Sequence, residues 1–178
     1  NPEIIRRNAG MGIVYTPLHG TGHKMVPEVL KMYGFRNVYP VEAQCINDGN
    51  FPTLRSPNPE EPDALAMALD LACEKKADLV MATDPDADRL GIAVRKPSGE
   101  FVLLNGNQTG ALLTWYIISQ KKKNSELKGN EYIINTIVTS DLLARIAEKN
   151  GVRCYSVLTG FKFFAALSCK LFDVCVFF

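Results

Sequence analysis

The sequence predicts an α/β fold: a three-layer-like domain with a mixed, partly parallel sheet flanked by helices, followed by the opening βαβ unit of a second, similar domain. Short β-rich runs alternate with helical periodicity from the start of the chain. A polar turn joins two apolar runs at residues 95–100, which favours a hairpin. After residue 130 the order of strand and helix begins again, and this predicts the second domain.

The first predicted unit is strand, helix, strand. A β-rich run at 11–15 ends in the polar loop 16–22. Four apolar residues then recur at helical spacing and predict a helix: Val26, Val29, Leu30 and Tyr33. Gly34 suits the end of this helix, and residues 37–41 form the next predicted strand. A helical crossover between two strands predicts that they are parallel.

A long loop follows at residues 42–59, and loops of this length are often functional or mobile. Proline and acidic residues then start a helix that reaches about Lys76. Its predicted buried stripe is Leu65, Leu69 and Ala72. Residues 78–83 form the next predicted strand, and 90–94 pairs with 101–104 as the hairpin.

A strongly apolar helix over 107–119 completes the first domain, which we place at residues 1–124. The polar, lysine-rich stretch 121–130 predicts a linker. We place the second domain at residues 129–178. Its predicted elements are a strand at 132–138, a helix from the N-cap Ser140 to about Lys149, and a strand at 152–157.

Composition excludes several classes of protein. The chain is 47% hydrophobic and 22% charged with a formal net charge of +1, so it is typical of a globular protein and offers no electrostatic case for binding nucleic acid or a membrane. Five widely spaced cysteines without a CxxC pair indicate neither a disulfide framework nor a thiolate zinc site, which fits the cytoplasm. Charges interrupt the apolar end, so we expect no membrane span. The start at Asn1, without a signal peptide, indicates an internal piece of a longer protein.

The most informative stretch is ATDPDADRLGIAV at residues 82–94. It places Asp84, Asp86 and Asp88 at alternate positions, with Arg89 next, on a tight connection between two predicted strands. Three like charges this close repel, so a cation among them is expected, and carboxylate oxygens suit Mg²⁺ or Ca²⁺. A metal ion beside an arginine is a frequent combination for binding phosphoryl groups. The alternative is a solvated turn whose acids cap nearby backbone N–H groups.

Two other interpretations of this loop fit poorly. In an EF-hand that starts at Asp84, Arg89 stands where glycine is needed and Arg95 stands where a bidentate glutamate is needed. A phosphatase nucleophile of the DxDxT type needs a hydroxyl where Asp88 stands.

The remaining candidate residues allow two interpretations each. Gly20-Thr21-Gly22 precedes a helix and could hold an anion or form a structural turn, but Met25 rules out a GxGxxG dinucleotide fingerprint. His19 could donate a proton or satisfy the hydrogen bonds of its loop. Lys162 follows a Thr-Gly turn at residues 159 and 160, where an isolated lysine is usually solvated.

Five segments occur in one order along the chain: YTPLHGTG at 15–22, FP through PNPE at 51–60, ATDPDADR at 82–89, LNGNQTG at 104–110 and TGFK at 159–162. This order resembles the α-D-phosphohexomutase superfamily. DPDADR with the GNQ and TGFK segments is most similar to its phosphoglucomutase-2 and phosphopentomutase type. The resemblance extends over about residues 8–165.

The resemblance implies an enzyme in which a phosphoserine exchanges its phosphoryl group with a phosphosugar through a bisphosphate. It assigns Mg²⁺ to Asp84, Asp86 and Asp88. It gives Arg89 a catalytic role in positioning phosphate, and Lys162 a catalytic role in proton transfer. Its substrate-binding residues are Arg89, Thr159, Gly160, Lys162 and His19. The implied substrates are glucose 1-phosphate, ribose 1-phosphate or glucose 1,6-bisphosphate, and the implied location is the cytoplasm.

The chain lacks the family's phosphoserine loop, its sugar-specificity loop and its final phosphate-binding domain. It therefore corresponds to the second domain and the start of the third, and we expect it to be inactive without the missing domains of the full-length chain. The tail 165–178 does not resemble the family's continuation. Two alternatives stay open: a non-catalytic truncated isoform or interaction module of the same fold, and a Mg²⁺-dependent phosphatase, for which no nucleophile is evident.

Overall fold

The computed structural model describes residues 2–171 and 175–177. It divides into two compact units, Asn1–Gly106 and Asn107–Phe178, and each has its own sheet. None of the helices in these described ranges is long and apolar enough to cross a membrane.

The first unit is built on a five-stranded mixed sheet in the order β2-β1-β3-β4-β5. Its strands are β1 (Gly12–Thr16), β2 (Asn37–Pro40), β3 (Leu79–Thr83), β4 (Leu90–Arg95) and β5 (Phe101–Leu104). β1 is parallel to both β2 and β3, whereas β4 is antiparallel to both β3 and β5. The predicted partly parallel sheet and its hairpin are confirmed.

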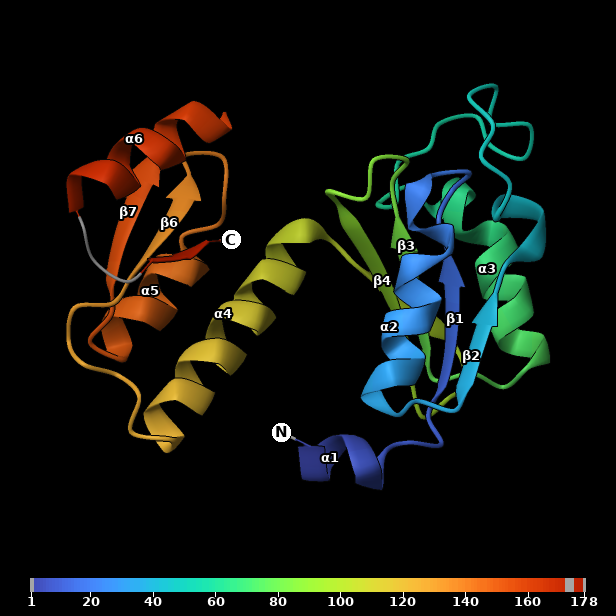
Figure 1. Ribbon diagram of the computed structural model, residues 1–178, viewed down its shortest axis with the longest axis horizontal. Helices are drawn as coiled ribbons and strands as arrows, with labels where there is room; N and C mark the ends of the chain where they lie inside the picture. Colours follow the sequence, from blue (N-terminus) through green and yellow to red (C-terminus); the bar gives the residue numbers. More distant parts are fainter. Residues whose placement is uncertain (1, 172–174, 178) are drawn as a thin grey trace. The chain divides into compact units, whose positions relative to one another are not determined.

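Helices cover both faces of this sheet, with α2 on one side and α3 on the other (Figure 1). The helical elements of the first unit are α1 (Pro2–Arg7), η1 (Thr21–His23), α2 (Met25–Tyr33), η2 (Glu42–Gln44) and α3 (Pro62–Glu74). α2 ends at Gly34, which adopts a φ of 107° and donates its N–H to the carbonyl groups of the last turn, as a C-terminal glycine does.

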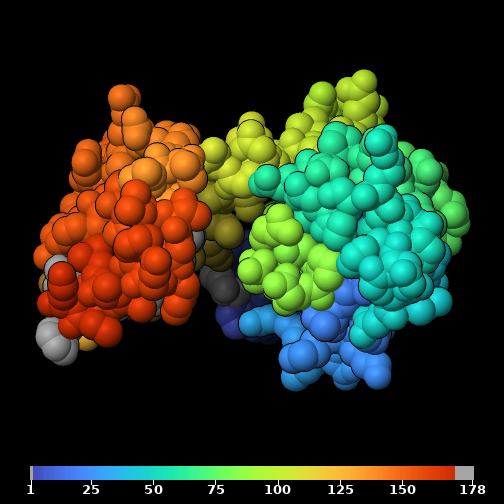
Figure 2. Space-filling model, turned by 90° about the horizontal axis from the view of Figure 1, so that it is seen from above, coloured from blue at the N-terminus to red at the C-terminus, as the bar shows by residue number. Residues whose placement is uncertain are grey.

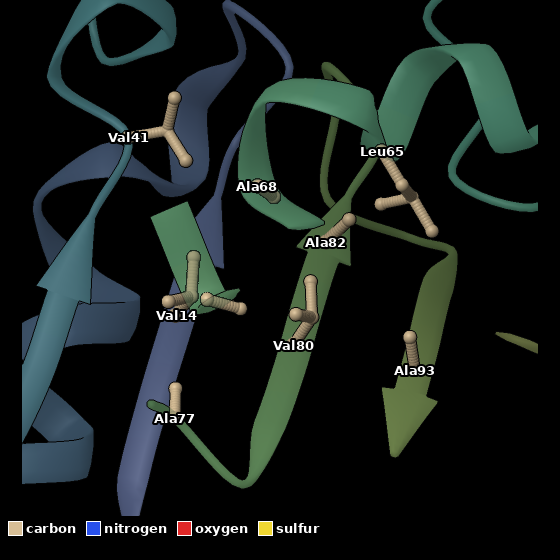
Figure 3. Packing of buried hydrophobic residues seen from close by; sticks show 9 residues of the cluster. Val14, Val41, Leu65, Ala68, Ala77, Val80, Ala82 and Ala93 are labelled. Carbon is tan, nitrogen blue, oxygen red and sulfur yellow. The ribbon is translucent and has the colours of Figure 1, made fainter. Parts of the chain in front are cut away.

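The main core of the first unit lies between α3 and the sheet. Leu65 and Ala68 on α3 face Val14, Val80 and Ala82 on the central strands (Figure 3). The predicted stripe of α3 is confirmed, because Leu65 and Ala72 are fully buried and Leu69 packs against the same cluster. Small alanine side chains on both surfaces let the helix lie close to the strands, and burying Leu65 alone contributes about 1.5–3 kcal/mol.

The predicted helix is confirmed as α2, but its four apolar residues do not form one buried stripe. The helix forms at the predicted place, but Val29 is 41% exposed and Tyr33 is 64% exposed. Pro27 is its buried residue, and Val26 and Leu30 are half-buried. Helical spacing alone therefore does not determine which face of α2 meets the sheet.

The second unit contains a three-stranded parallel sheet in the order β7-β6-β8. Its elements are α4 (Gly106–Lys123), which begins at the last residue of the first unit, then β6 (Tyr132–Thr136), α5 (Leu142–Lys149), β7 (Arg153–Val157), α6 (Phe161–Leu171) and β8 (Cys175–Phe177). The predicted βαβ unit is present as β6, α5 and β7. The tail adds β8, which pairs with β6.

The compact units divide at a different residue from the limits that the sequence predicts. A first domain at residues 1–124 would include α4 in the first unit. The sequence also predicts that residues 121–130 form a linker. In the structure α4 continues to Lys123, and its buried Ala111 and Ile118 join the core of the second unit beside Ile133 and Leu143. The apolar face of α4 determines this grouping, and sequence periodicity does not say which core that face joins.

The start of α5 also differs by one residue. Asp141 holds the N-cap position but makes no side-chain capping bond. The hydroxyl of Ser140, the predicted N-cap, accepts a 3.3 Å hydrogen bond from the N–H of Leu142, so Ser140 still satisfies one free donor of the first turn.

A close contact between the long loop and the sheet gives a test of the fold. A Cβ atom on Gly91 of β4 would overlap the backbone carbonyl of Pro59, at the end of loop 42–59. We expect Gly91→Ala to lower the free energy of unfolding by about 1–3 kcal/mol, as overpacked sites do. Urea unfolding followed by circular dichroism measures the change.

The matched control is Gly49→Ala, because a Cβ atom there has nothing within 4 Å. It should change the free energy of unfolding by no more than about 1 kcal/mol in either direction. Equal destabilisation by the two substitutions would contradict the packing of Pro59 on β4.

Candidate metal and phosphate site

The three predicted acidic ligands lie together at the turn between β3 and β4. Asp84 follows the buried end of β3 and is only 2% exposed, whereas Asp86 and Asp88 are exposed. One carboxylate oxygen from each residue lies within 4.8 Å of the other two. Six ligands at about 2.1 Å from a Mg²⁺ ion are about 3.0 or 4.2 Å apart, so small side-chain rotations bring these oxygens into that range. The donor set fits a small hard cation.

Arg89 neutralises the buried acid from two directions. Its backbone N–H donates to Oδ1 of Asp84 at 2.9 Å, and its Nε–H donates to Oδ2 at 2.6 Å. The guanidinium itself is 58% exposed, and Nε lies 3.9 Å from a carboxylate oxygen of Asp88. A carboxylate has about four lone-pair sites. Asp84 therefore keeps acceptor capacity for a metal ion, but Arg89 competes for it.

The surroundings of the loop shift the pKa values of Asp84 and Asp88 in opposite directions. Burial works to raise the pKa of Asp84, but the backbone N–H and the guanidinium of Arg89 outweigh burial, so this pKa lies below its ordinary value. The negative charge of Asp86, followed by burial and by Asp84, raises the pKa of Asp88. Asp84 thus stays ionised to a lower pH than an ordinary aspartate, whereas Asp88 takes up a proton at a higher pH than an ordinary aspartate. A cation between them would relieve this repulsion.

A second loop, from the end of β1, is fastened onto the acidic turn. Thr21 donates both its backbone N–H, at 2.8 Å, and its hydroxyl, at 3.1 Å, to the carbonyl oxygen of Pro85. Gly20 has no room for a Cβ atom, which would overlap the backbone of Pro85. Below this contact, the hydroxyl groups of Tyr15 and Thr83 form a buried 2.8 Å hydrogen bond. The Gly-Thr-Gly segment is therefore a close-packed support of the acidic turn.

His19 is held in place by the long loop. Its Nδ1 donates to the carbonyl of Ile46 at 2.9 Å, so its Nε2 accepts, and it does so from the hydroxyl of Thr53 at 2.8 Å. The ring is 4% exposed. These bonds match the second interpretation of His19, a residue that satisfies its loop. A contact with substrate stays a prediction, and it would require exchange of one of these bonds.

Hydrogen bonds of the buried Gln44 join the end of β1 to the long loop, and the sequence does not predict them. The hydroxyl of Thr16 donates to Oε1 of Gln44 at 2.5 Å, and Nε2 of Gln44 donates to the hydroxyl of Thr53 at 3.1 Å. Gln44 is fully buried, although its loop is rich in polar residues. Gln44 and Thr53 lie in the long loop and belong to no periodic pattern, so the sequence carries no signal for them. Figure 2 shows loop 42–59, in cyan, on the surface of the first unit.

The remaining predicted site residues lie at the start of α6 in the second unit. Thr159 is exposed, and Gly160 adopts a φ of 130°, a left-handed conformation that favours glycine. Lys162 is exposed, with Nζ 5.1 Å from the ring centroid of Phe163. The turn therefore presents the Lys162 cation to solvent, whereas the carbonyl oxygen of Gly160 accepts a 3.0 Å hydrogen bond from the N–H of Phe163. The roles predicted for these three residues stay predictions.

Two family models match consecutive parts of the chain. Residues 3–99 match phosphoglucomutase/phosphomannomutase alpha/beta/alpha domain II, and residues 105–171 match domain III of the same family. The chain belongs to the phosphoglucomutase/phosphomannomutase family. This confirms the resemblance to the α-D-phosphohexomutase superfamily and the assignment to its second and third domains. The match continues to residue 171, so the expectation that residues from 165 depart from the family is wrong for 165–171.

A curated relative and two solved structures show how far the likeness extends. The chain is 48% identical over 153 residues to a phosphoglucomutase of Staphylococcus aureus, covering 86% of this chain but only 27% of the relative. A putative phosphomannomutase from Thermus thermophilus is similar with a TM-score of 0.71 at 23% identity, over 96% of this chain and 36% of that one. An Aspergillus fumigatus N-acetylphosphoglucosamine mutase, in complex with GlcNAc-6P and magnesium, is similar with a TM-score of 0.59 at 17% identity, over 94% and 32%. The two structures support the fold.

The backbone of the acidic turn gives a test at this site. Ala87 adopts a φ of 60°, in the left-handed region that costs an L-residue about 1–2 kcal/mol. We expect Ala87→Gly to raise the free energy of unfolding by about 0.5–1 kcal/mol, after the greater freedom of glycine in the unfolded chain is subtracted. Urea unfolding measures it.

Ala66→Gly is the matched control, because Ala66 is exposed within α3. The same chemical change should there lower the free energy of unfolding by about 1 kcal/mol. A loss of stability at both positions would contradict the left-handed backbone at Ala87.

Proposed function

We propose that the chain is part of a Mg²⁺-dependent phosphosugar mutase. This enzyme moves a phosphoryl group between the C1 and C6 (or C5) hydroxyls of glucose or pentose phosphates through a phosphoserine and a bisphosphate. The single observation that carries the proposal is the group of Asp84, Asp86 and Asp88, which converge within 4.8 Å beside Arg89. The names of the matching relatives support the reaction class, since they are phosphoglucomutases.

Each residue of the site has a role in this proposal. The three aspartates hold Mg²⁺, which when bound polarises a phosphate oxygen and neutralises its charge. Magnesium is also named in the complex of the similar Aspergillus mutase. The exposed guanidinium of Arg89 binds the transferring phosphoryl group in a fork geometry. In the second unit, Lys162 moves a proton at the sugar hydroxyl, and the Thr159-Gly160 turn binds the substrate.

The substrates in this proposal are glucose 1-phosphate, ribose 1-phosphate or glucose 1,6-bisphosphate, and the enzyme is of the phosphopentomutase or phosphoglucomutase type in the cytoplasm. The chain spans 27% of the Staphylococcus relative. Phosphoryl transfer depends on positioning the donor and acceptor in one cleft. We therefore assign turnover to the longer protein, with the missing domains as partners of this chain.

The experiment that tests the proposal is paramagnetic broadening of amide NMR signals by Mn²⁺, a stand-in for Mg²⁺. We expect selective broadening of residues 83–90, because the carboxylates are already gathered in the isolated chain. Asp86→Asn should abolish it, since it removes one charged ligand. Asp70→Asn, on the exposed side of α3, is the matched control and should leave it unchanged.

An assay of turnover separates this function from its alternatives. The chain alone should convert no glucose 1-phosphate to glucose 6-phosphate. Unaided hydrolysis of phosphate esters would instead identify a phosphatase. Absence of localised broadening in a well-dispersed spectrum would leave the acids as a solvated turn and contradict the metal site.

Competition between Arg89 and the metal gives a second prediction. Arg89→Gln should bind Mg²⁺ roughly tenfold more tightly than the unsubstituted chain, because a charge-assisted hydrogen bond of about 1.5 kcal/mol no longer occupies Asp84. The same variant should be less stable without metal, since the buried carboxylate loses its counter-ion. Thermal unfolding with and without Mg²⁺ measures both effects.

Arg95→Gln is the control, because Arg95 ends β4 and pairs with Asp78 at 2.6 Å, away from the acidic turn. Its response to Mg²⁺ should equal that of the unsubstituted chain. Weaker Mg²⁺ binding by Arg89→Gln would mean that Arg89 supports the metal ligands and does not compete for them.

A further inference from the structure

The second unit contains a pocket of about 470 Å³ whose lining includes none of the proposed mutase residues. Its lining consists of Asn150 and six residues that supply an exposed aromatic ring, two aliphatic side chains and three cations: Trp115, Leu142, Ile146, Lys122, Arg145 and Lys149. All six residues belong to α4 and α5. The volume lies in the range of small-molecule sites, roughly 300–1,000 Å³.

The two helices run side by side in the same direction (Figure 1). Near their beginnings, the side-chain oxygen of Asn107 accepts a 2.8 Å hydrogen bond from the N–H of Ser140. One turn further, a Cβ atom on Gly110 would lie 3.6 Å from Leu143. Because α4 has 18 residues and α5 has 8, α4 extends beyond the end of α5, and the last turns of the two helices contribute Lys122 and Lys149 to the lining of the pocket.

The lining of the pocket thus combines apolar and basic side chains. Trp115 lies two helical turns before Lys122 on the same face of α4. Leu142 and Ile146 lie before Lys149 on one face of α5 by the same spacing rule. Trp115 is 54% exposed and Leu142 is 51% exposed, so the wall offers uncovered ring and aliphatic surface next to positive charge.

The positive charge is not balanced within the part of the chain that the structure describes. No carboxylate there forms an ion pair with Lys122, Arg145 or Lys149, whereas Arg7, Arg89 and Arg95 each have one. Lys122 and Lys149 in the last turns also complement the dipoles of their helices. Arg145 stands before the last turn, so the helix dipole does not account for it. A guanidinium without a carboxylate partner suits a phosphate.

We propose that this pocket binds a nucleoside phosphate, with the base stacked on Trp115 and the phosphates held by Arg145, Lys122 and Lys149. A flat ring matches the indole, because stacking needs only two π-faces. The negative charge of the phosphates matches Lys122, Arg145 and Lys149, which form no ion pair among the residues that the structure describes. The proposal does not rest on the mutase function, since it uses neither the acidic turn nor the residues at the start of α6.

Trp115 is the only tryptophan of the chain, so its fluorescence reports on this pocket alone. The experiment titrates the chain with ADP and follows emission excited where adenine does not absorb. EDTA is present, so that the acidic turn cannot recruit the nucleotide through a shared metal ion. We expect a saturable change in emission, and at least fivefold weaker binding by Arg145→Gln and by Lys149→Gln.

The matched control is Lys123→Gln, which removes the same charge from the last turn of α4 at a residue that does not line the pocket. It should bind ADP as the unsubstituted chain does. All three variants carry exposed substitutions, and unchanged urea unfolding verifies that they fold. Equal weakening by all three would overturn the pocket, because it would indicate a general effect of net charge.

Two partial ligands separate the roles of ring and charge. Adenosine carries the ring without the phosphates, and inorganic phosphate carries the charge without the ring. Each should bind at least tenfold more weakly than ADP. Equal binding by either one would overturn the proposed ligand class. A response to a glutamate-rich peptide without a response to ADP would also overturn it, and would indicate an acidic protein partner instead.

Discussion

The candidate site depends on the burial of one carboxylate. Asp84 lies at the end of β3 with almost no exposure, so its charge must have partners within the fold. Arg89 supplies them through its backbone N–H and its guanidinium, and these bonds hold the turn in a shape that brings Asp86 and Asp88 near Asp84. The same bonds leave the other acids crowded. The hydrogen bonds of Arg89 therefore hold the turn in place, but the repulsion between its carboxylates is not fully compensated.

The surrounding loops keep this turn in place through contacts that tolerate little change. Gly20 lies against the backbone of Pro85, and Gly91 lies against the carbonyl of Pro59. Between them, Gln44 joins the loop after β1 to the long loop after β2. Because β1 and β3 are parallel neighbours, their following loops leave the sheet at the same edge. The support of the acidic turn is thus a consequence of strand order.

The second unit carries a different kind of chemistry. Its turn before α6 presents Gly160 and Lys162 to solvent, whereas its paired helices α4 and α5 present an aromatic ring beside unpaired cations. Family membership accounts for the order of the two units, since consecutive family domains match them. The pocket between α4 and α5 lies within the residues that match domain III of the family.

The sequence by itself determined the fold class, most strand positions and the acidic turn. These follow from local patterns: β-rich runs, helical spacing, and three aspartates at alternate positions before an arginine. Only the tertiary structure decided which face of α2 is buried, which core α4 joins, how Gln44 and Thr53 fix His19, and that Trp115 lies beside Arg145. The physical reason is that these features come from contacts between residues far apart in the chain, and a local pattern fixes what a segment forms but not what it meets.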